Sequence, residues 1–178
     1  MTRRLPFLLL AAAAFLASPK PASAQSFYGS FGSGSFSSFP SESYYTYTPR
    51  PPRARHDRRM DPHLLKAARI AEANAFPYST ARCWHYVKQA LVQSGAVGGY
   101  PTTDYACQAG DELSSRYGFV RLAIHDPYSA PVGSVLVYKG GGSGAGHVEF
   151  RTEHGFASDY RSPWRCRYRL IGVYAKFA

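Results

Sequence analysis

Acidic residues are scarce in this chain of 178 residues, which has 11 Asp and Glu against 21 Lys and Arg and a formal net charge of +10. No apolar run reaches the ~18 residues expected of a membrane-spanning helix. The phosphate-binding G-x-x-x-x-G-K-[ST] loop and the strand-coupled G-x-G-x-x-G fingerprint are both missing. These absences argue against stable membrane insertion and against the two commonest nucleotide-binding classes. The apolar fraction of 45% is ordinary, so the chain as a whole is not disordered.

The N-terminus has the pattern of a secretory signal peptide. Residues 1–4 are short and basic, residues 5–17 are apolar but too short to span a bilayer comfortably, and A-S-A at 22–24 is a small-x-small cleavage site. We therefore expect residues 1–24 to be removed and the mature chain to be periplasmic or secreted. In such a compartment disulfides are permissible.

The composition divides the remaining chain into a tail and one domain. Residues 25–60 are rich in Ser, Gly and Tyr and then in Pro and Arg, without helical or strand periodicity. We interpret them as a disordered linker. Residues 61–178 are long enough to form one hydrophobic core.

Three helices are expected in the first half of this domain. Asp61-Pro62 is an N-cap followed by a proline at the first helical position, and this helix should end before Pro77. A second helix, capped by Ser79 or Thr80, should run to Gly95, with Trp84, Val87 and Leu91 forming one buried stripe. A third should lie between Thr103 and Gly118.

After residue 118 the spacing of the apolar residues changes, and they recur at every second position, as in strands. The expected strands are 119–124, 134–138, 147–151, 156–160 and 168–174. Helices followed by consecutive strands predict an α+β fold, with N-terminal helices packed on an antiparallel sheet of about five strands.

Cys83 is the candidate nucleophile. It lies in the first turn of the second predicted helix, where the helix dipole and unpaired N–H groups favour a thiolate. His147 begins a later strand after a glycine-rich loop, in G-A-G-H-V-E-F at 144–150. A cysteine at a helix start followed by a histidine on a sheet is the papain-type arrangement, in which the histidine acts as the base.

Together these segments resemble the NlpC/P60 superfamily, with the CHAP amidases as a near relative. The resemblance runs through the Cys83 helix, P-V-G-S-V-L-V-Y at 131–138, G-H-V-E-F at 146–150 and G-F-A-S-D at 155–159. It implies a papain-like fold and a bacterial cell-wall endopeptidase or amidase that acts on peptidoglycan stem peptides. Cys83 matches the family's nucleophile, His147 its base, and Asp159 falls where the third triad member is expected. The sequence departs from the family at Arg82-Cys83-Trp84-His85, where D-C-S-G is usual.

A hairpin argument also brings Asp159 towards His147. If residues 153–155 form a three-residue loop, Glu149 faces Asp159, and both lie on the face of His147. Either acid could then orient the imidazole. We prefer Asp159 from the resemblance and keep Glu149 as the alternative orienter or a substrate contact. A register slip of one residue would move Asp159 to the other face.

The two remaining cysteines are expected to form a disulfide. Three cysteines in an oxidising compartment allow one bridge and one leftover, and a nucleophile must remain a free thiol. We therefore predict a Cys107–Cys166 bridge between the third helix and the last strand region.

Other classes of function fit the sequence less well. A zinc site using His147, Glu149 and His154, or Cys83 and His85, lacks the usual metal-ligand spacing, so we expect no metal and no cofactor. The domain carries 13 Lys and Arg against 9 Asp and Glu with no focused basic helix, which argues against nucleic acid as a partner. A cell-wall-binding module without catalysis is the main alternative. We expect a monomer whose partner is peptidoglycan.

Overall fold

The computed structural model describes residues 51–140, 142 and 144–178. The predicted signal peptide and residues 25–50 of the predicted linker lie outside this part of the chain. Within it, no helix is long and apolar enough to cross a membrane.

Three α-helices form where the sequence predicts them. They are α1 (Pro62–Asn74), α2 (Cys83–Ser94) and α3 (Ala109–Tyr117), with a short 3-10 turn, η1 (Ala106–Gln108), leading into α3. The Asp61 carboxylate caps α1 by accepting a hydrogen bond of 2.8 Å from the backbone N–H of His63. Gly95 and Gly118 end α2 and α3 in the left-handed conformation, as is usual after a helix.

The second half forms one antiparallel sheet of six strands, one more than expected. The strands are β1 (Val120–Leu122), β2 (Val135–Tyr138), β3 (His147–Arg151), β4 (Phe156–Ala157), β5 (Arg161–Ser162) and β6 (Leu170–Ala175). Their order across the sheet is β1-β6-β2-β3-β4-β5. The extra strand arises because the segment predicted as 156–160 turns after Ala157 and returns as β5.

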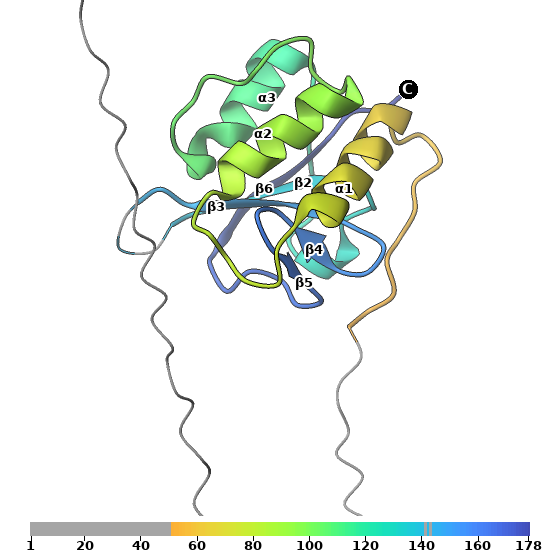
Figure 1. The fold of residues 1–178 in the computed structure, drawn as a ribbon. Helices are drawn as coiled ribbons and strands as arrows, with labels where there is room; N and C mark the ends of the chain where they lie inside the picture. The colour runs from red at the N-terminus through yellow and green to blue at the C-terminus, as the bar shows by residue number, and fades with distance from the viewer. Residues whose placement is uncertain (1–50, 141, 143) are drawn as a thin grey trace, which may run out of the picture. The chain divides into compact units, whose positions relative to one another are not determined.

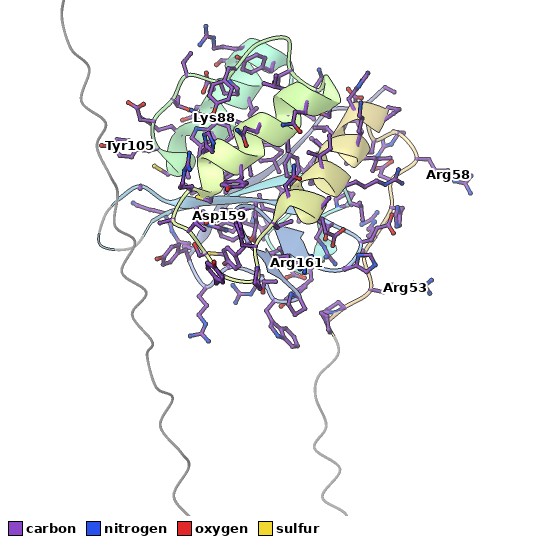
Figure 2. All side chains as sticks on the ribbon, in the orientation of Figure 1. Arg53, Arg58, Lys88, Tyr105, Asp159 and Arg161 are labelled. Atoms are coloured by element: carbon purple, nitrogen blue, oxygen red, sulfur yellow. The ribbon has the colours of Figure 1, made fainter. Side chains whose placement is uncertain are left out.

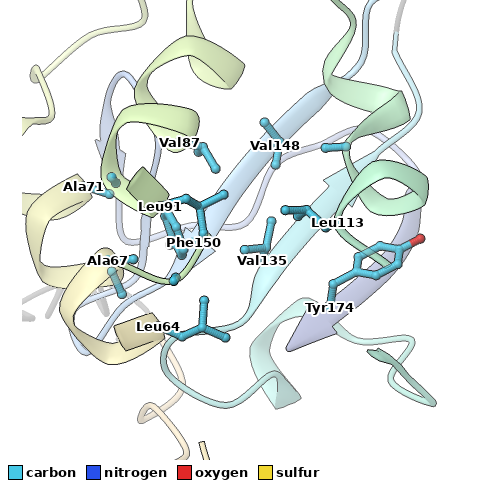
Figure 3. Close-up of a cluster of buried hydrophobic side chains, with 14 of the residues drawn as sticks. Leu64, Ala67, Ala71, Val87, Leu91, Leu113, Val135, Val148, Phe150 and Tyr174 are labelled. Carbon is cyan, nitrogen blue, oxygen red and sulfur yellow. The ribbon is translucent and has the colours of Figure 1, made fainter. Parts of the chain in front are cut away.

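The helices cover one face of the sheet (Figure 1). α2 packs over β3, α3 over β6, and α1 over β3 and β4. The core lies between these two layers, and Figure 3 shows helix and strand side chains meeting there: Leu64, Ala67 and Ala71 from α1, Val87 and Leu91 from α2, Leu113 from α3, and Val135, Val148, Phe150 and Tyr174 from the sheet. The predicted stripe of Trp84, Val87 and Leu91 is buried, which confirms the orientation of α2.

The segment before α1 belongs to the folded unit. The backbone N–H of Val132 donates to the Arg55 carbonyl at 2.8 Å, and that of Ala178 donates to the Arg59 carbonyl at 2.9 Å. The buried Arg151 guanidinium donates to the carbonyl of Pro52 at 3.3 Å. Residues between 52 and 60 therefore satisfy backbone and guanidinium groups of the domain that was expected to begin at residue 61.

Candidate active site

Cys83 is the first residue of α2. The helix begins later than a Ser79 or Thr80 cap would require, because Arg82 occupies the N-cap position without a side-chain cap. The Cys83 backbone N–H therefore has no intrahelical acceptor, and the positive end of the helix dipole lies at its thiol. The residue is partly exposed. This environment suits an accessible thiolate.

His147 lies at the start of β3 and is 8% exposed. Its Nε2 is 3.1 Å from Oε2 of Glu149. The two residues are two positions apart on one strand, so their side chains emerge on the same face. The Cys83 side chain lies close enough to His147 to act on the pKa of the imidazole. The structure thus brings Cys83, His147 and Glu149 together.

The surroundings of His147 favour its protonated form. Burial by itself lowers the pKa of His147, but the interactions of the ring with Cys83 and with the Glu149 carboxylate outweigh it. The net effect raises the pKa of His147 to about 10. At neutral pH the site is therefore arranged to hold an imidazolium beside Glu149.

The second oxygen of Glu149 is also occupied. Its Oε1 accepts a hydrogen bond of 2.6 Å from the Tyr138 hydroxyl and one of 3.4 Å from the backbone N–H of Cys166. Burial and the neighbouring Glu149 charge raise the pKa of Tyr138, so its phenol stays protonated and can donate. These contacts fix the carboxylate that holds His147.

Asp159 does not contact His147. Its Oδ2 accepts hydrogen bonds from the backbone N–H of Thr80 at 2.6 Å and of Arg82 at 3.3 Å, and from the hydroxyls of Thr80 and Ser79. Its Oδ1 accepts from the Ser158 hydroxyl. Figure 2 shows Asp159 beside the N-terminal end of α2. Burial acts to raise the pKa of Asp159, but the N–H donors of Thr80 and Arg82 hold it below its usual value. Asp159 therefore anchors the loop that leads into Cys83.

The β3–β4 hairpin differs from the expected one in two ways. Phe150 pairs with Ala157 and Arg151 with Phe156, so the register is shifted by one residue from the expected pairing of Thr152 with Phe156. β4 then ends at Ala157 and the chain turns back into β5, so Asp159 lies in the turn between these strands and does not pair with Glu149. From this turn Asp159 meets the loop before α2.

The predicted Cys107–Cys166 disulfide is not formed, because all three cysteines are free. Cys107 lies against the loop that precedes His147, where its Sγ contacts the Gly144 carbonyl at 3.5 Å. A Cβ at Gly146 would lie 2.7 Å from that of Cys107, so glycine permits this close approach. Cys166 lies instead beside Glu149, and burial raises the pKa of its thiol.

A groove of about 500 Å³ opens beside His147. Its lining, which the sequence did not reveal, consists of Ser79, His147, Tyr160, Ser162, Trp164, Arg165, Cys166, Arg167 and Tyr168. Most of these residues belong to the connection between β5 and β6. The only sequence signal for them is the W-R-C-R-Y-R run at 164–169, which mixes aromatic and basic residues. In the described part of the chain, no cluster of three or more His, Cys, Asp or Glu residues could hold a metal ion.

A helix that begins with a cysteine and packs on an antiparallel sheet carrying a histidine defines the papain-like α+β fold. Solved structures similar to this one come from the type VI effector–immunity complex Tae3–Tai3 of Ralstonia pickettii. The native complex matches with a TM-score of 0.50 and 22% identity, over 65% of this chain and 98% of the other. Its selenomethionine counterpart matches with a TM-score of 0.48 and 25% identity, over 62% and 99%.

Comparison of the sequence with known families and proteins assigns this chain to no family. No protein-family model matches the chain, and no curated protein matches it. The papain-like fold expected from the NlpC/P60 resemblance is confirmed by the structural likeness. Membership of the NlpC/P60 superfamily itself stays a prediction.

Proposed function

We propose that this chain is an exported cysteine hydrolase that cleaves peptide or amide bonds in bacterial peptidoglycan stem peptides. The observation that carries the proposal is the placement of Cys83, the first residue of α2, near His147, whose Nε2 lies 3.1 Å from Oε2 of Glu149. The papain-like fold supports the same reaction class. Glu149 replaces Asp159 as the proposed orienting residue, because its carboxylate is the one that contacts the imidazole.

Acylation follows from this geometry. The Cys83 thiolate attacks the amide carbonyl carbon and forms a new S–C bond. The negative charge on the carbonyl oxygen can be stabilised by the unpaired backbone N–H of Cys83 at the start of α2. The His147 imidazolium then donates its proton to the leaving amine as the C–N bond breaks. Glu149 keeps the ring in place throughout.

Deacylation reverses the role of His147. The neutral imidazole takes a proton from water, and the resulting hydroxide attacks the acyl-enzyme. The S–C bond breaks, a carboxylic acid leaves, and the thiolate–imidazolium pair is restored. No metal or cofactor is needed to balance this reaction.

Peptidoglycan is proposed as the substrate on two grounds. The resemblance to NlpC/P60 enzymes implies it, and the positive charge of the chain suits an anionic wall polymer. Endopeptidase and amidase activities share this chemistry and differ only in which amide enters the site. The predicted signal peptide supports export to the wall.

Digestion of purified peptidoglycan, followed by mass spectrometry of the soluble products, tests the proposal and identifies the bond. The wild-type protein should release fragments with a new amine and a new carboxylate. Cys83→Ala and His147→Ala should release none, while circular dichroism shows both folded. Cys107→Ala is the matched control, since it removes a partly exposed thiol outside the His147 contact and should retain activity.

Two outcomes would overturn the proposal. Release of fragments by Cys83→Ala would exclude the thiol mechanism. Sedimentation of the wild-type protein with peptidoglycan, without any cleavage, would identify it as a catalytically inactive binding module instead.

A further inference from the structure

The connection between β5 and β6 carries a concentration of positive charge next to His147. This β5–β6 loop (residues 163–169) contains Arg165, Arg167 and Arg169, all exposed. Arg165 and Arg167 line the groove together with His147, and no acidic side chain is among the described residues that line it. The Glu149 carboxylate is buried and already accepts hydrogen bonds from Tyr138 and Cys166 in addition to its contact with His147. The charge of His147 is therefore balanced by Glu149, whereas the two arginines that line the groove have no acid paired with them in the described part of the chain.

The backbone of the β5–β6 loop is held at several points. The N–H of Cys166 donates to Glu149, and the N–H of Arg165 donates to the Tyr128 hydroxyl at 3.3 Å. At its end, the N–H of Lys139 donates to the Arg169 carbonyl at 2.9 Å. Because the loop is anchored to the carboxylate that holds His147, its position relative to the reacting groups is fixed.

The guanidinium heads themselves remain open to a ligand. Arg165 makes one side-chain hydrogen bond, to the carbonyl of its neighbour Cys166. Neither Arg165 nor Arg167 forms a salt bridge with any acid in the described part of the chain. A guanidinium binds a carboxylate through two parallel hydrogen bonds, and such charge-assisted bonds are stronger than neutral ones.

Two aromatic side chains flank the same groove. Trp164 and Tyr168 are each 46% exposed. Large, half-exposed aromatic rings offer apolar area to a bound chain while their polar edges stay hydrated. Together with the arginines they suit an extended ligand that has both an apolar stem and a negative charge.

We infer that Arg165 and Arg167 make the enzyme selective for peptides that carry a free carboxylate close to the scissile amide. This inference rests on the proposed function, because it concerns the substrate of the same site. The carboxylate would bind the guanidinium groups of the β5–β6 loop, which sets the amide beside Cys83 and His147.

A pair of stem peptides that differ only in one carboxylate, free or converted to the carboxamide, tests the inference. The wild-type kcat/KM should be about tenfold or more higher for the acid, as expected for a charge-assisted contact. In Arg165→Gln/Arg167→Gln this preference should fall to near unity. Arg69→Gln, which removes an exposed charge on α1 away from the groove, should retain the preference.

A binding measurement tests the selectivity independently of the proposed hydrolysis. Calorimetric titration of the Cys83→Ala protein with each peptide should show tighter binding of the acid, and the double arginine variant of that protein should lose the difference. Tighter binding without cleavage by the wild type would disprove the hydrolase and leave the selectivity standing. Equal binding of the two peptides would overturn the selectivity, as would an equal loss of preference in Arg69→Gln.

Discussion

His147 and Glu149 lie two positions apart on β3 and meet at 3.1 Å between Nε2 and Oε2. One strand therefore supplies both the proposed base and the group proposed to orient it. The contact depends on the alternation of side chains along β3 and needs no particular hairpin register. It is more robust to changes in the neighbouring loops than a contact between two strands would be.

Glu149→Gln should lower kcat by about 100-fold or more, since the imidazole loses the charge that fixes its orientation and supports its protonated form. Steady-state kinetics on a soluble stem peptide would measure this. Glu153→Gln, at the exposed tip of the β3–β4 hairpin, is the matched control and should leave kcat unchanged. A wild-type kcat in Glu149→Gln would remove Glu149 from the mechanism.

The decrease of kcat/KM at high pH should reflect the deprotonation of His147. Its pKa is raised to about 10 by Cys83 and Glu149 against the opposing effect of burial. The imidazolium needed for acylation is lost as the pH rises through this value, so kcat/KM should fall there. In Glu149→Gln the decrease should move to lower pH, because the neutral amide no longer supports the positive charge. Titration of the imidazole by NMR would give the same pKa values, and a decrease at unchanged pH would contradict the assignment.

Asp159→Asn should destabilise the protein by about 2–3 kcal/mol, because a buried carboxylate that accepts backbone and hydroxyl hydrogen bonds loses its charge. Since the pKa of Asp159 is lowered in the folded state, its contribution is present above the ordinary carboxyl pKa and is lost as the pH falls through the folded value. Urea unfolding of variant and wild type at neutral and acidic pH would measure both effects. Asp104→Asn, at an exposed position, should change little; an equal loss there would count against the anchor.

The three thiols should differ in reactivity and none should be bridged. The mass of the protein, isolated without reductant, should not change on reduction. Iodoacetamide should modify Cys83 first, because this thiol is partly exposed, starts α2 and lies near His147. Cys166 should react slowly, because burial raises the pKa of its thiol. Peptide mapping at short labelling times distinguishes them. Rapid labelling that persists in Cys83→Ala would point to another reactive thiol.

The sequence predicts the helices and most strands, because these depend on local caps and periodicity. The pairing of Cys83 with His147 as nucleophile and base stays a prediction. The role of Asp159 was missed for a physical reason at Gly155. That glycine was interpreted as the closing residue of a three-residue turn. In the structure its φ is +148°, and a Cβ there would lie 2.2 Å from the Ser162 carbonyl oxygen. Gly155 is required by the close passage of the chain after β5, which no local pattern indicates.

The cysteine pairing was missed for a similar reason. Whether two thiols meet depends on the distance between their Cα atoms, and sequence spacing does not determine that distance. Cys107 and Cys166 lie against different partners, the Gly144–Gly146 loop and Glu149. The groove residues were equally hidden, because they come from a loop whose position depends on the completed sheet.

The anchoring of the Cys83 loop by Asp159 has a consequence for biosynthesis. The ribosome makes Cys83 well before His147, Glu149 and Asp159, which all belong to the last third of the sequence. A nascent chain that stops short of β3 would therefore carry the thiol without its proposed base and without the carboxylate that anchors its loop. On the proposed mechanism, hydrolysis therefore requires β3 to have formed, and Cys83 lacks its proposed base while the first part of the chain is being made.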